Sequence, residues 1–386
     1  MFRSGQTQHD DENTPNRTLR LGFESALYWL DKLFRRDIRE VGQHSSMLPQ
    51  YLLFAALATA LPLAILLSVQ LWMVTAYTGG FDLSSFVSQY CHGVYRYRLL
   101  GRDLLLCLYH FLQAHVAERP YPLPRDPSGS FLLYGAFAIS NGVYFAASNL
   151  LLLFFLWIRK AGLRDRELSL YFYYTLLVAM SMAVVTPYDQ LAYLLLLIGI
   201  LGTRSGSVVA GMSLVVISAA AGTLNRETEF LFASFLATMG LFSPRVVARR
   251  YWIYLAVDLV ISVGLYVGVR IAIPGDVQVI QSMTYGGKWA PESLFVLMML
   301  LVAGVAMAMR LYRDVRPVVV FLILSIPYLL AVLISGVFRE LRLMVPILLC
   351  VLCIYTLLER TYASERSGSS DAEKGMGGDA INLRRK

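Results

Sequence analysis

Arginine stands directly beside an acidic residue in two short polar segments that separate long apolar runs. NRET places Glu227 beside Arg226, and FRELR places Glu340 beside Arg339. A guanidinium fork is a natural ligand for a phosphate or pyrophosphate group. The same pattern also fits structural ion pairs, or contacts with lipid headgroups. The candidate phosphate-binding residues are Arg96, Arg98, Arg226, Glu227, Arg339, Glu340 and Arg342.

Asp82 is the carboxylate that could work together with these arginines. It follows the first long apolar run, and Gly79 and Gly80 just before it let a backbone or a ligand approach closely. A carboxylate in such a place can take a proton from an acceptor hydroxyl as a general base. Asp82 followed by LSSFVSQY also resembles the start of a helix, where its side chain would be an N-cap. The two interpretations are compatible.

The composition indicates that a membrane surrounds the elements that position these side chains. Of the 386 residues, 57% are hydrophobic and 16% are charged, and the mean hydropathy is +0.56. Soluble globular domains are less apolar. In lipid a backbone must satisfy its own polar groups, which favours helices of about 20 residues. We expect an all-α, polytopic bundle of about ten helices, near residues 49–76, 131–158, 168–186, 190–203, 206–223, 228–243, 251–273, 292–309, 317–337 and 343–358.

The distribution of Lys and Arg predicts how the bundle is oriented. If the N-terminus is cytoplasmic, alternate gaps carry the basic clusters, for example Arg245, Arg249 and Arg250, and the positive-inside rule is satisfied. Both termini are then cytoplasmic, in the plasma (inner) membrane. The formal charge of +8 follows from this orientation, so we expect no nucleic-acid partner. The candidate arginines fall on the outer face against this bias, so we expect them to have a use there.

The chain divides into four parts by composition. We expect a disordered N-terminus (1–17), a cytoplasmic interfacial amphipathic helix (18–47), a transmembrane bundle (48–359) that includes a long outer loop (77–130), and a disordered cytoplasmic tail (360–386). Within the outer loop, LLGRDLLLCLYHFLQAHVA predicts an amphipathic helix on the outer membrane surface. Its apolar residues are Leu100, Leu104, Cys107, Leu108, Phe111 and Leu112.

A long first outer loop with an acid just past the first helix, followed by interface helices, resembles the GT-C superfamily of polytopic glycosyltransferases. YRYRLL, the PYDQ turn, NRET and FRELR together are similar to uncharacterised bacterial members, and the resemblance runs from about the first predicted helix to the last. FDLSS supplies a single acid where members often show paired acids. We therefore assign no metal ligands and leave a divalent metal open as a cofactor.

The resemblance implies sugar transfer from a polyprenyl-phosphate donor to an extracytoplasmic glycan or lipid acceptor. The donor phosphate would be held by the candidate arginines while Asp82 deprotonates the acceptor hydroxyl, with inversion at the anomeric carbon. Two alternatives are a transporter or flippase of a lipid-linked or anionic substrate, and an oligosaccharide polymerase or ligase. The first is disfavoured because no internal repeat is evident, and the second because the longest loop is the first rather than a late one.

Several other residues have ordinary explanations. Cys350 and Cys353 lie among apolar neighbours, which predicts packing, and Cys91 beside His92 has no second pair at metal-ligand spacing. Asp258 lies inside a predicted helix, where it is either protonated or paired with a basic residue. Arg270 near the end of that helix can reach outward to water, and Asp189 of PYDQ is left without a role.

Overall fold

The computed structural model describes most of the expected bundle, including most of the predicted outer loop. The described residues are 59–60, 63–64, 66–68, 75–76, 81–93, 95–119, 129–157, 171, 174–175, 178, 184–273, 315–335 and 344–358. The segments predicted for 1–17, 18–47, 292–309 and 360–386 lie outside them. So do three candidate site residues, Arg339, Glu340 and Arg342.

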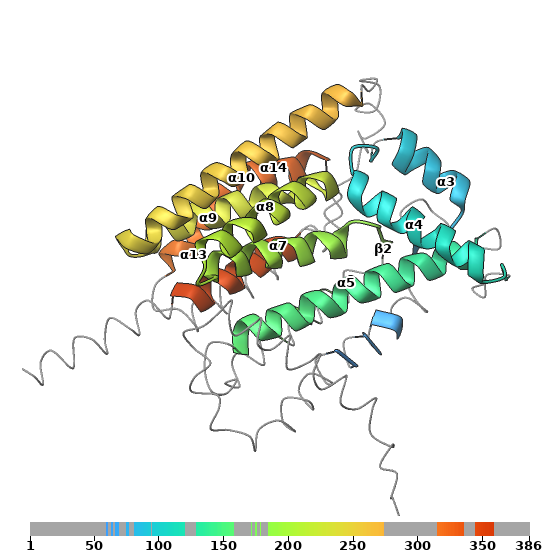
Figure 1. Cartoon of the computed structure of the whole chain (residues 1–386), viewed down its shortest axis with the longest axis horizontal. Coiled ribbons are helices and arrows are strands. Elements are labelled where there is room, and N and C mark those ends of the chain that lie inside the picture. The colour runs from blue at the N-terminus through green and yellow to red at the C-terminus, as the bar shows by residue number, and fades with distance from the viewer. Residues whose placement is uncertain are drawn as a thin grey trace, which may run out of the picture.

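The described residues confirm the all-α class. Their helices, drawn in Figure 1, include α5 (Phe131–Trp157), α7 (Asp189–Arg204), α8 (Val208–Asn225), α9 (Phe230–Phe242) and α10 (Arg245–Ala272). Helix α8 packs between α7 and α10, α9 packs on α10, and α5 packs on the other side of α7. A further helix, Val345–Leu358, contributes to their shared core.

Three described helical segments are long and apolar enough to cross a membrane. They are Phe131–Phe155 within α5, all of α8, and all of α10. The predicted run at 251–273 began too late, because α10 starts at Arg245. Arginine side chains are unfavourable in the hydrocarbon layer but compatible with helical backbone. The basic cluster therefore forms the first turns of α10, before the apolar part of the helix.

Two other predicted helices differ from the structure at their ends. The runs at 49–76 and 168–186 finish in two-residue strands, β1 (Thr75–Ala76) and β2 (Val184–Val185), which pair in parallel. Pro187 follows soon after β2 and disfavours helix at the residue before it, while valine is well suited to extended backbone. These last residues were therefore wrongly assigned to helices.

The predicted helix at 317–337 is interrupted. Helix α13 (Arg316–Leu324) ends at Ser325, and α14 (Ile326–Ser335) follows at once. Pro327 explains the break, because proline has no N–H and its ring would clash with the carbonyl group four residues earlier. The Ser325 hydroxyl donates to the Phe321 carbonyl oxygen at 2.8 Å, which caps the end of α13.

The segment predicted as the first outer loop forms helices at one end of the bundle. These are α3 (Leu83–Val87), a π-helical turn η3 (Ser88–His92) and α4 (Leu99–His115), which lie beside the starts of α5 and α7 in Figure 1. Helix α4 packs on α5 and α8 through Gly101, Leu105 and Tyr109, and these are its buried residues. The predicted amphipathic helix is thus confirmed as an element.

Helix α4 also has an exposed apolar face. Leu104 and Phe111 are 42% and 58% exposed, and Cys107 lies on the same side and is exposed. Exposed apolar side chains beside a bundle are what a helix needs in order to lie along a membrane surface. The predicted apolar set is therefore divided: Leu104, Cys107 and Phe111 are exposed, whereas Leu108 and Leu112 pack against the bundle.

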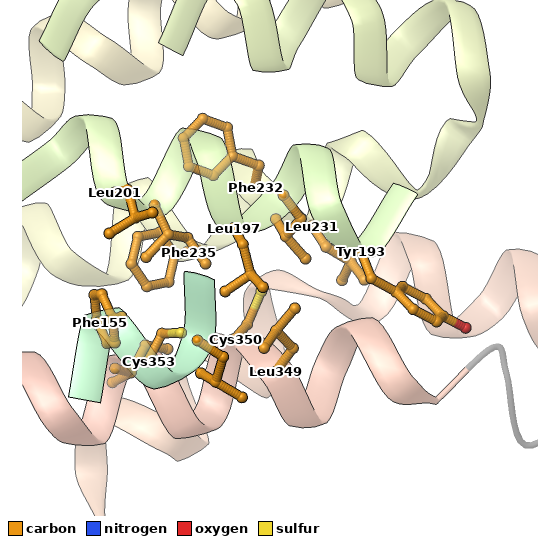
Figure 2. Close-up of a cluster of buried hydrophobic side chains, with 14 of the residues drawn as sticks. Phe155, Tyr193, Leu197, Leu201, Leu231, Phe232, Phe235, Leu349, Cys350 and Cys353 are labelled. Carbon is orange, nitrogen blue, oxygen red and sulfur yellow. The ribbon is translucent and has the colours of Figure 1, made fainter. Parts of the chain in front are cut away.

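Two cores hold these elements. The larger one joins α5, α7, α9 and the helix Val345–Leu358, and Figure 2 shows part of it around Leu197, Phe232 and Phe235. Cys350 and Cys353 are free and buried there, which confirms their predicted packing role. The smaller core is aromatic and lies at the α4 end of the bundle: it includes Phe81, Phe86, Tyr90, Tyr95, Tyr109, Phe137 and Tyr188.

Candidate functional site

The PYDQ turn is built around Asp189, the first residue of α7. The Thr186 hydroxyl donates to Asp189 Oδ2 at 2.6 Å, and the Asp189 N–H donates back to Thr186 Oγ1 at 3.3 Å. A carboxylate in the first turn of a helix is also favoured by the helix dipole. Both residues are buried, so these bonds hold the turn in one conformation against the end of the bundle.

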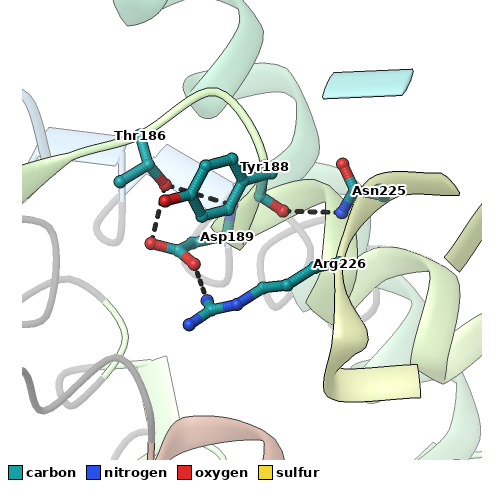
Figure 3. A network of polar contacts seen from close by, with 5 residues as sticks. All are labelled: Thr186, Tyr188, Asp189, Asn225 and Arg226. Atoms are coloured by element: carbon teal, nitrogen blue, oxygen red, sulfur yellow. Dashed lines mark hydrogen bonds and ion pairs between the residues drawn. The ribbon is translucent and has the colours of Figure 1, made fainter. Parts of the chain in front are cut away.

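Arg226 of NRET reaches this turn from the end of α8. Its Nη1 forms an ion pair with Asp189 Oδ1, as Figure 3 shows, and only 7% of the Arg226 side chain and 3% of the Asp189 side chain are exposed. Next to it, Asn225 Nδ2 donates to the Tyr188 carbonyl oxygen at 2.8 Å. Arg226 thus pairs with a residue of a separate polar segment, the PYDQ turn, while the adjacent Glu227 begins the 3-10 turn η4 (Glu227–Glu229).

Tyr188 brings a second candidate arginine to the same place. The Cζ atom of Arg98, from the first outer loop, lies 4.3 Å from the centre of the Tyr188 ring and 4.6 Å from that of Tyr95. The Cζ atom of Arg226 lies 5.4 Å from the same Tyr188 ring. Cation–π contacts at these distances are favourable, and most so where water is excluded. The structure therefore brings Arg98 and Arg226 together around one aromatic ring.

A close backbone approach locks the first outer loop onto this site. A Cβ atom on Gly101 of α4 would lie 2.6 Å from the Pro187 carbonyl oxygen and 2.7 Å from Asn225 Oδ1. Only glycine fits between these atoms. One glycine contact thus joins α4, the PYDQ turn and NRET, which are three separate outer segments of the sequence.

Arg96 and Arg270 meet at a neighbouring ring, that of Tyr97. Arg96 Nη2 donates to the Tyr97 hydroxyl at 3.0 Å, and its Nε is buried without a hydrogen-bond partner. The Cζ atom of Arg270, in the last turn of α10, lies 4.7 Å from the centre of the Tyr97 ring and 3.8 Å from that of Tyr266. Arg270 thus contacts the first outer loop, a partner that its position in the sequence did not indicate.

Arg102 illustrates the ordinary structural role of an outer arginine. Its Nε lies 2.6 Å from Asp103 Oδ1, and its Nη1 donates to the carbonyl oxygens of Tyr90 at 3.3 Å and Arg96 at 3.5 Å. These bonds fix the backbone that carries Arg96 and Arg98. The ion pair with Asp103 is the structural alternative that the sequence had left open for the outer arginines.

Asp82 is the N-cap of α3. Its Oδ2 accepts hydrogen bonds from the Ser84 hydroxyl and, at 3.0 Å each, from the N–H and hydroxyl of Ser85. These bonds, led by the Ser84 side chain and then the Ser85 backbone, lower the pKa of the Asp82 carboxyl group. None of its hydrogen bonds involves a candidate arginine. The N-cap interpretation is therefore present in the structure, while the general-base interpretation stays a prediction.

Two residues of the α4 end could not be assigned a role from the residue pattern. Asp189 and Tyr188 carry the central contacts, and their signal in the sequence was only the polar PYDQ turn.

Within the part of the chain that the structure describes, no group of three or more His, Cys, Asp or Glu side chains could hold a metal ion. Comparisons with family models, curated proteins and solved structures find no match for this chain.

Proposed function

We propose that the protein is a membrane glycosyltransferase that moves a sugar from a polyprenyl-phosphate donor to an extracytoplasmic acceptor hydroxyl, with inversion. The observation that supports this most is the meeting of Arg98 and Arg226 at the Tyr188 ring. These arginines come from two separate outer segments, and a lipid-linked phosphate at the bilayer surface is a ligand that fixed guanidinium groups would bind. Arg96 and Arg270, gathered at Tyr97, extend the basic region.

In the proposed reaction the acceptor oxygen attacks the anomeric carbon of the sugar. The bond from that carbon to the donor phosphate oxygen breaks, the polyprenyl phosphate leaves, and the acceptor proton passes to a carboxylate. Because the leaving group gathers negative charge, arginines held in place before the reaction would stabilise the transition state electrostatically. Arg226 is already paired with Asp189, so a bound phosphate would compete with that carboxylate for the guanidinium group.

Two carboxylates are candidates for the base. Asp82 is accessible, but its bound Oδ2 and lowered pKa make it a weaker base. Asp189 lies at the arginines, and its Oδ1 would be released if phosphate took over Arg226. Asparagine at each position separates the two, because it keeps the side-chain shape and removes the basic carboxylate.

The finer topology belongs to the same proposal. We propose about ten transmembrane helices, cytoplasmic termini, a plasma-membrane location and a site on the outer face, which includes Arg339, Glu340 and Arg342. Single cysteines at positions 82, 226 and 340 should react with a membrane-impermeant thiol reagent in intact cells, after unfolding where the residue is buried. A single cysteine at position 245 should be protected until the membrane is opened. Reversed labelling would contradict the orientation.

The activity test uses purified protein in liposomes with radiolabelled polyprenyl-phosphate sugars and candidate glycan acceptors. Transfer should fall at least tenfold in Arg98→Ala and Arg226→Ala, as expected when a transition-state contact worth about 1.4 kcal/mol or more is lost. Arg245→Ala is the matched control, an exposed arginine in the first turn of α10, and should keep full activity.

The outcomes of this assay divide the hypotheses. Among variants shown to remain folded, loss in Asp189→Asn with activity retained in Asp82→Asn would identify Asp189 as the base, and the reverse would identify Asp82. Transfer that survives both arginine changes would refute the proposed site. Movement of the labelled donor across the bilayer with no new glycosidic bond would refute the proposed glycosyl transfer and support the transporter alternative.

A further inference from the structure

Two carboxyl groups are buried inside the helix bundle away from the arginines described above. Glu229 ends the turn η4 before α9 and is 4% exposed, and Asp258 in α10 is 1% exposed. The two groups are close enough to interact electrostatically. The Glu229 carboxyl group lies against Gly222 and Ser218 of α8, and Asp258 belongs to α10, which packs on α8 and α9. An ionisable side chain at such a place is costly to keep for packing alone, because an apolar side chain would do the same.

The contacts of Glu229 indicate that it carries a proton. The Ser218 hydroxyl lies 2.9 Å from the Leu195 carbonyl oxygen and 3.0 Å from Glu229 Oε1. A hydroxyl has one hydrogen to donate, and a carbonyl oxygen only accepts. The Ser218 hydroxyl can donate a full hydrogen bond to only one of these two acceptors. A protonated Glu229 that donates to Ser218 Oγ, while Ser218 donates to Leu195, would satisfy both contacts.

Asp258 has an unmet bonding capacity at the same place. Its Oδ1 accepts from the Ser262 hydroxyl at 3.4 Å, and its Oδ2 is buried with no hydrogen-bond partner. Among the described residues, the titratable groups that act on the pair are the two carboxyl groups themselves and the Cys350 thiol, from the helix Val345–Leu358. No described arginine or lysine neutralises them, so a proton is the cation that remains.

The pair is connected to the outer arginines by a short stretch of backbone. The Glu229 N–H donates to the Arg226 carbonyl oxygen at 3.4 Å, and the Arg226 N–H donates to the Gly222 carbonyl oxygen at 2.7 Å. Gly222 lies against the Glu229 carboxyl group, and any Cβ there would clash with it. A change in the charge of Glu229 would therefore act on the turn that positions Arg226.

We propose that Glu229 and Asp258 form an intramembrane proton-binding site that exchanges one proton with water and so changes the position of Arg226. The proton moves between a carboxyl oxygen of the pair and bulk water, and no other reactant is needed. This inference does not depend on glycosyl transfer, because a proton site coupled to an outer anion site would serve either an enzyme or a transporter.

Infrared difference spectroscopy of the full chain in lipid nanodiscs tests the site directly. Between neutral and alkaline pH, the wild type should lose one C=O stretching band of a protonated carboxylic acid. Glu229→Gln and Asp258→Asn should each remove or shift that band, since either change removes one carboxyl group and alters the electrostatic environment of the other. Asp103→Asn is the matched control at an exposed carboxylate and should leave the band unchanged.

Three results would overturn the proposal. The first is a wild-type spectrum without a buried carboxylic acid band, and the second is a band that both amide variants leave in place. The third is a carboxylate signal that responds to sodium at constant pH, which would make the pair a metal-cation site. If a single variant fails to fold, the double variant Glu229→Gln with Asp258→Asn decides: it leaves no buried charge and no titratable proton, so it should fold and lack the band. A double variant that unfolds, or that keeps the band, would contradict the proposal.

Discussion

Asp189→Asn is the most direct test of the buried ion pair at the α4 end. The substitution keeps the shape of the side chain but leaves the Arg226 guanidinium group without its counter-charge at a site where only 7% of that side chain is exposed. Removing one partner of a buried pair typically destabilises a protein by about 3–5 kcal/mol. The contact of Arg226 with the Tyr188 ring remains, which retains up to about 2 kcal/mol of attraction in a desolvated setting. We therefore expect a loss near the lower limit, about 3 kcal/mol.

The double variant Asp189→Asn with Arg226→Met gives the sharper result. It leaves no buried charge, so it should be less destabilised than either single variant, because replacing a whole buried pair with uncharged side chains is often close to neutral. Free energies of unfolding would be measured by titrating purified protein in mixed micelles with a denaturing detergent. The coupling between the two positions then follows from the double-mutant cycle.

The reasoning fails on either of two outcomes. A loss below about 1 kcal/mol in Asp189→Asn is typical of a solvent-exposed pair, and would mean that water reaches Arg226. Strictly additive effects in the double variant would mean that the two side chains do not interact. Either result would also remove the main support for competition between Asp189 and a donor phosphate.

Two further predictions concern the outer loop. Gly101→Ala should destabilise the protein by about 1–3 kcal/mol, because the new Cβ would overpack against the Pro187 carbonyl oxygen. Gly135→Ala is the control: its Cβ would meet only Leu112 at 3.9 Å, so it should be neutral or slightly stabilising. Equal effects of the two substitutions in the same unfolding assay would contradict the close approach of α4. Asp82→Ala should cost about 1 kcal/mol and Asp82→Ser much less, because serine is also a good N-cap. The pKa of Asp82 in the folded protein lies below the usual 3.8, so its contribution to the free energy of unfolding should be fully present well above pH 3.8. That contribution should disappear as the pH falls through the pKa of the folded state. If the contribution of Asp82 were already lost near neutral pH, this prediction would be refuted.

Most of the described helices could be predicted from the apolar runs alone. The runs at 206–223 and 228–243 correspond closely to α8 and α9, because a long apolar segment bounded by polar turns has no other way to satisfy its backbone in lipid. The errors came at the ends. A proline broke the run at 317–337, and a proline-bounded valine pair formed a strand, both through local backbone constraints that hydropathy does not record.

The candidate site was predictable only in part. Topology placed Arg98 and Arg226 at the same end of the bundle, and the structure puts both at one ring. The pairing of Arg226 with Asp189 depends on how α7 and α8 are rotated about their axes. Glu229 was overlooked for the same reason, because it follows a polar turn in the sequence but points into the core.

The sequence by itself determined that the chain is apolar and helical, and which segments lie at a common end, because backbone hydrogen bonding and side-chain transfer to lipid are local properties of each segment. Only the tertiary structure decided which charges meet. Gly101 allows α4 to approach the Pro187 backbone and the Asn225 side chain closely, and that approach sets Arg98 over Tyr188. Contacts between helices depend on the rotation of each helix about its axis and on close packing between segments that are distant in the sequence. The spacing of residues along the chain predicts neither.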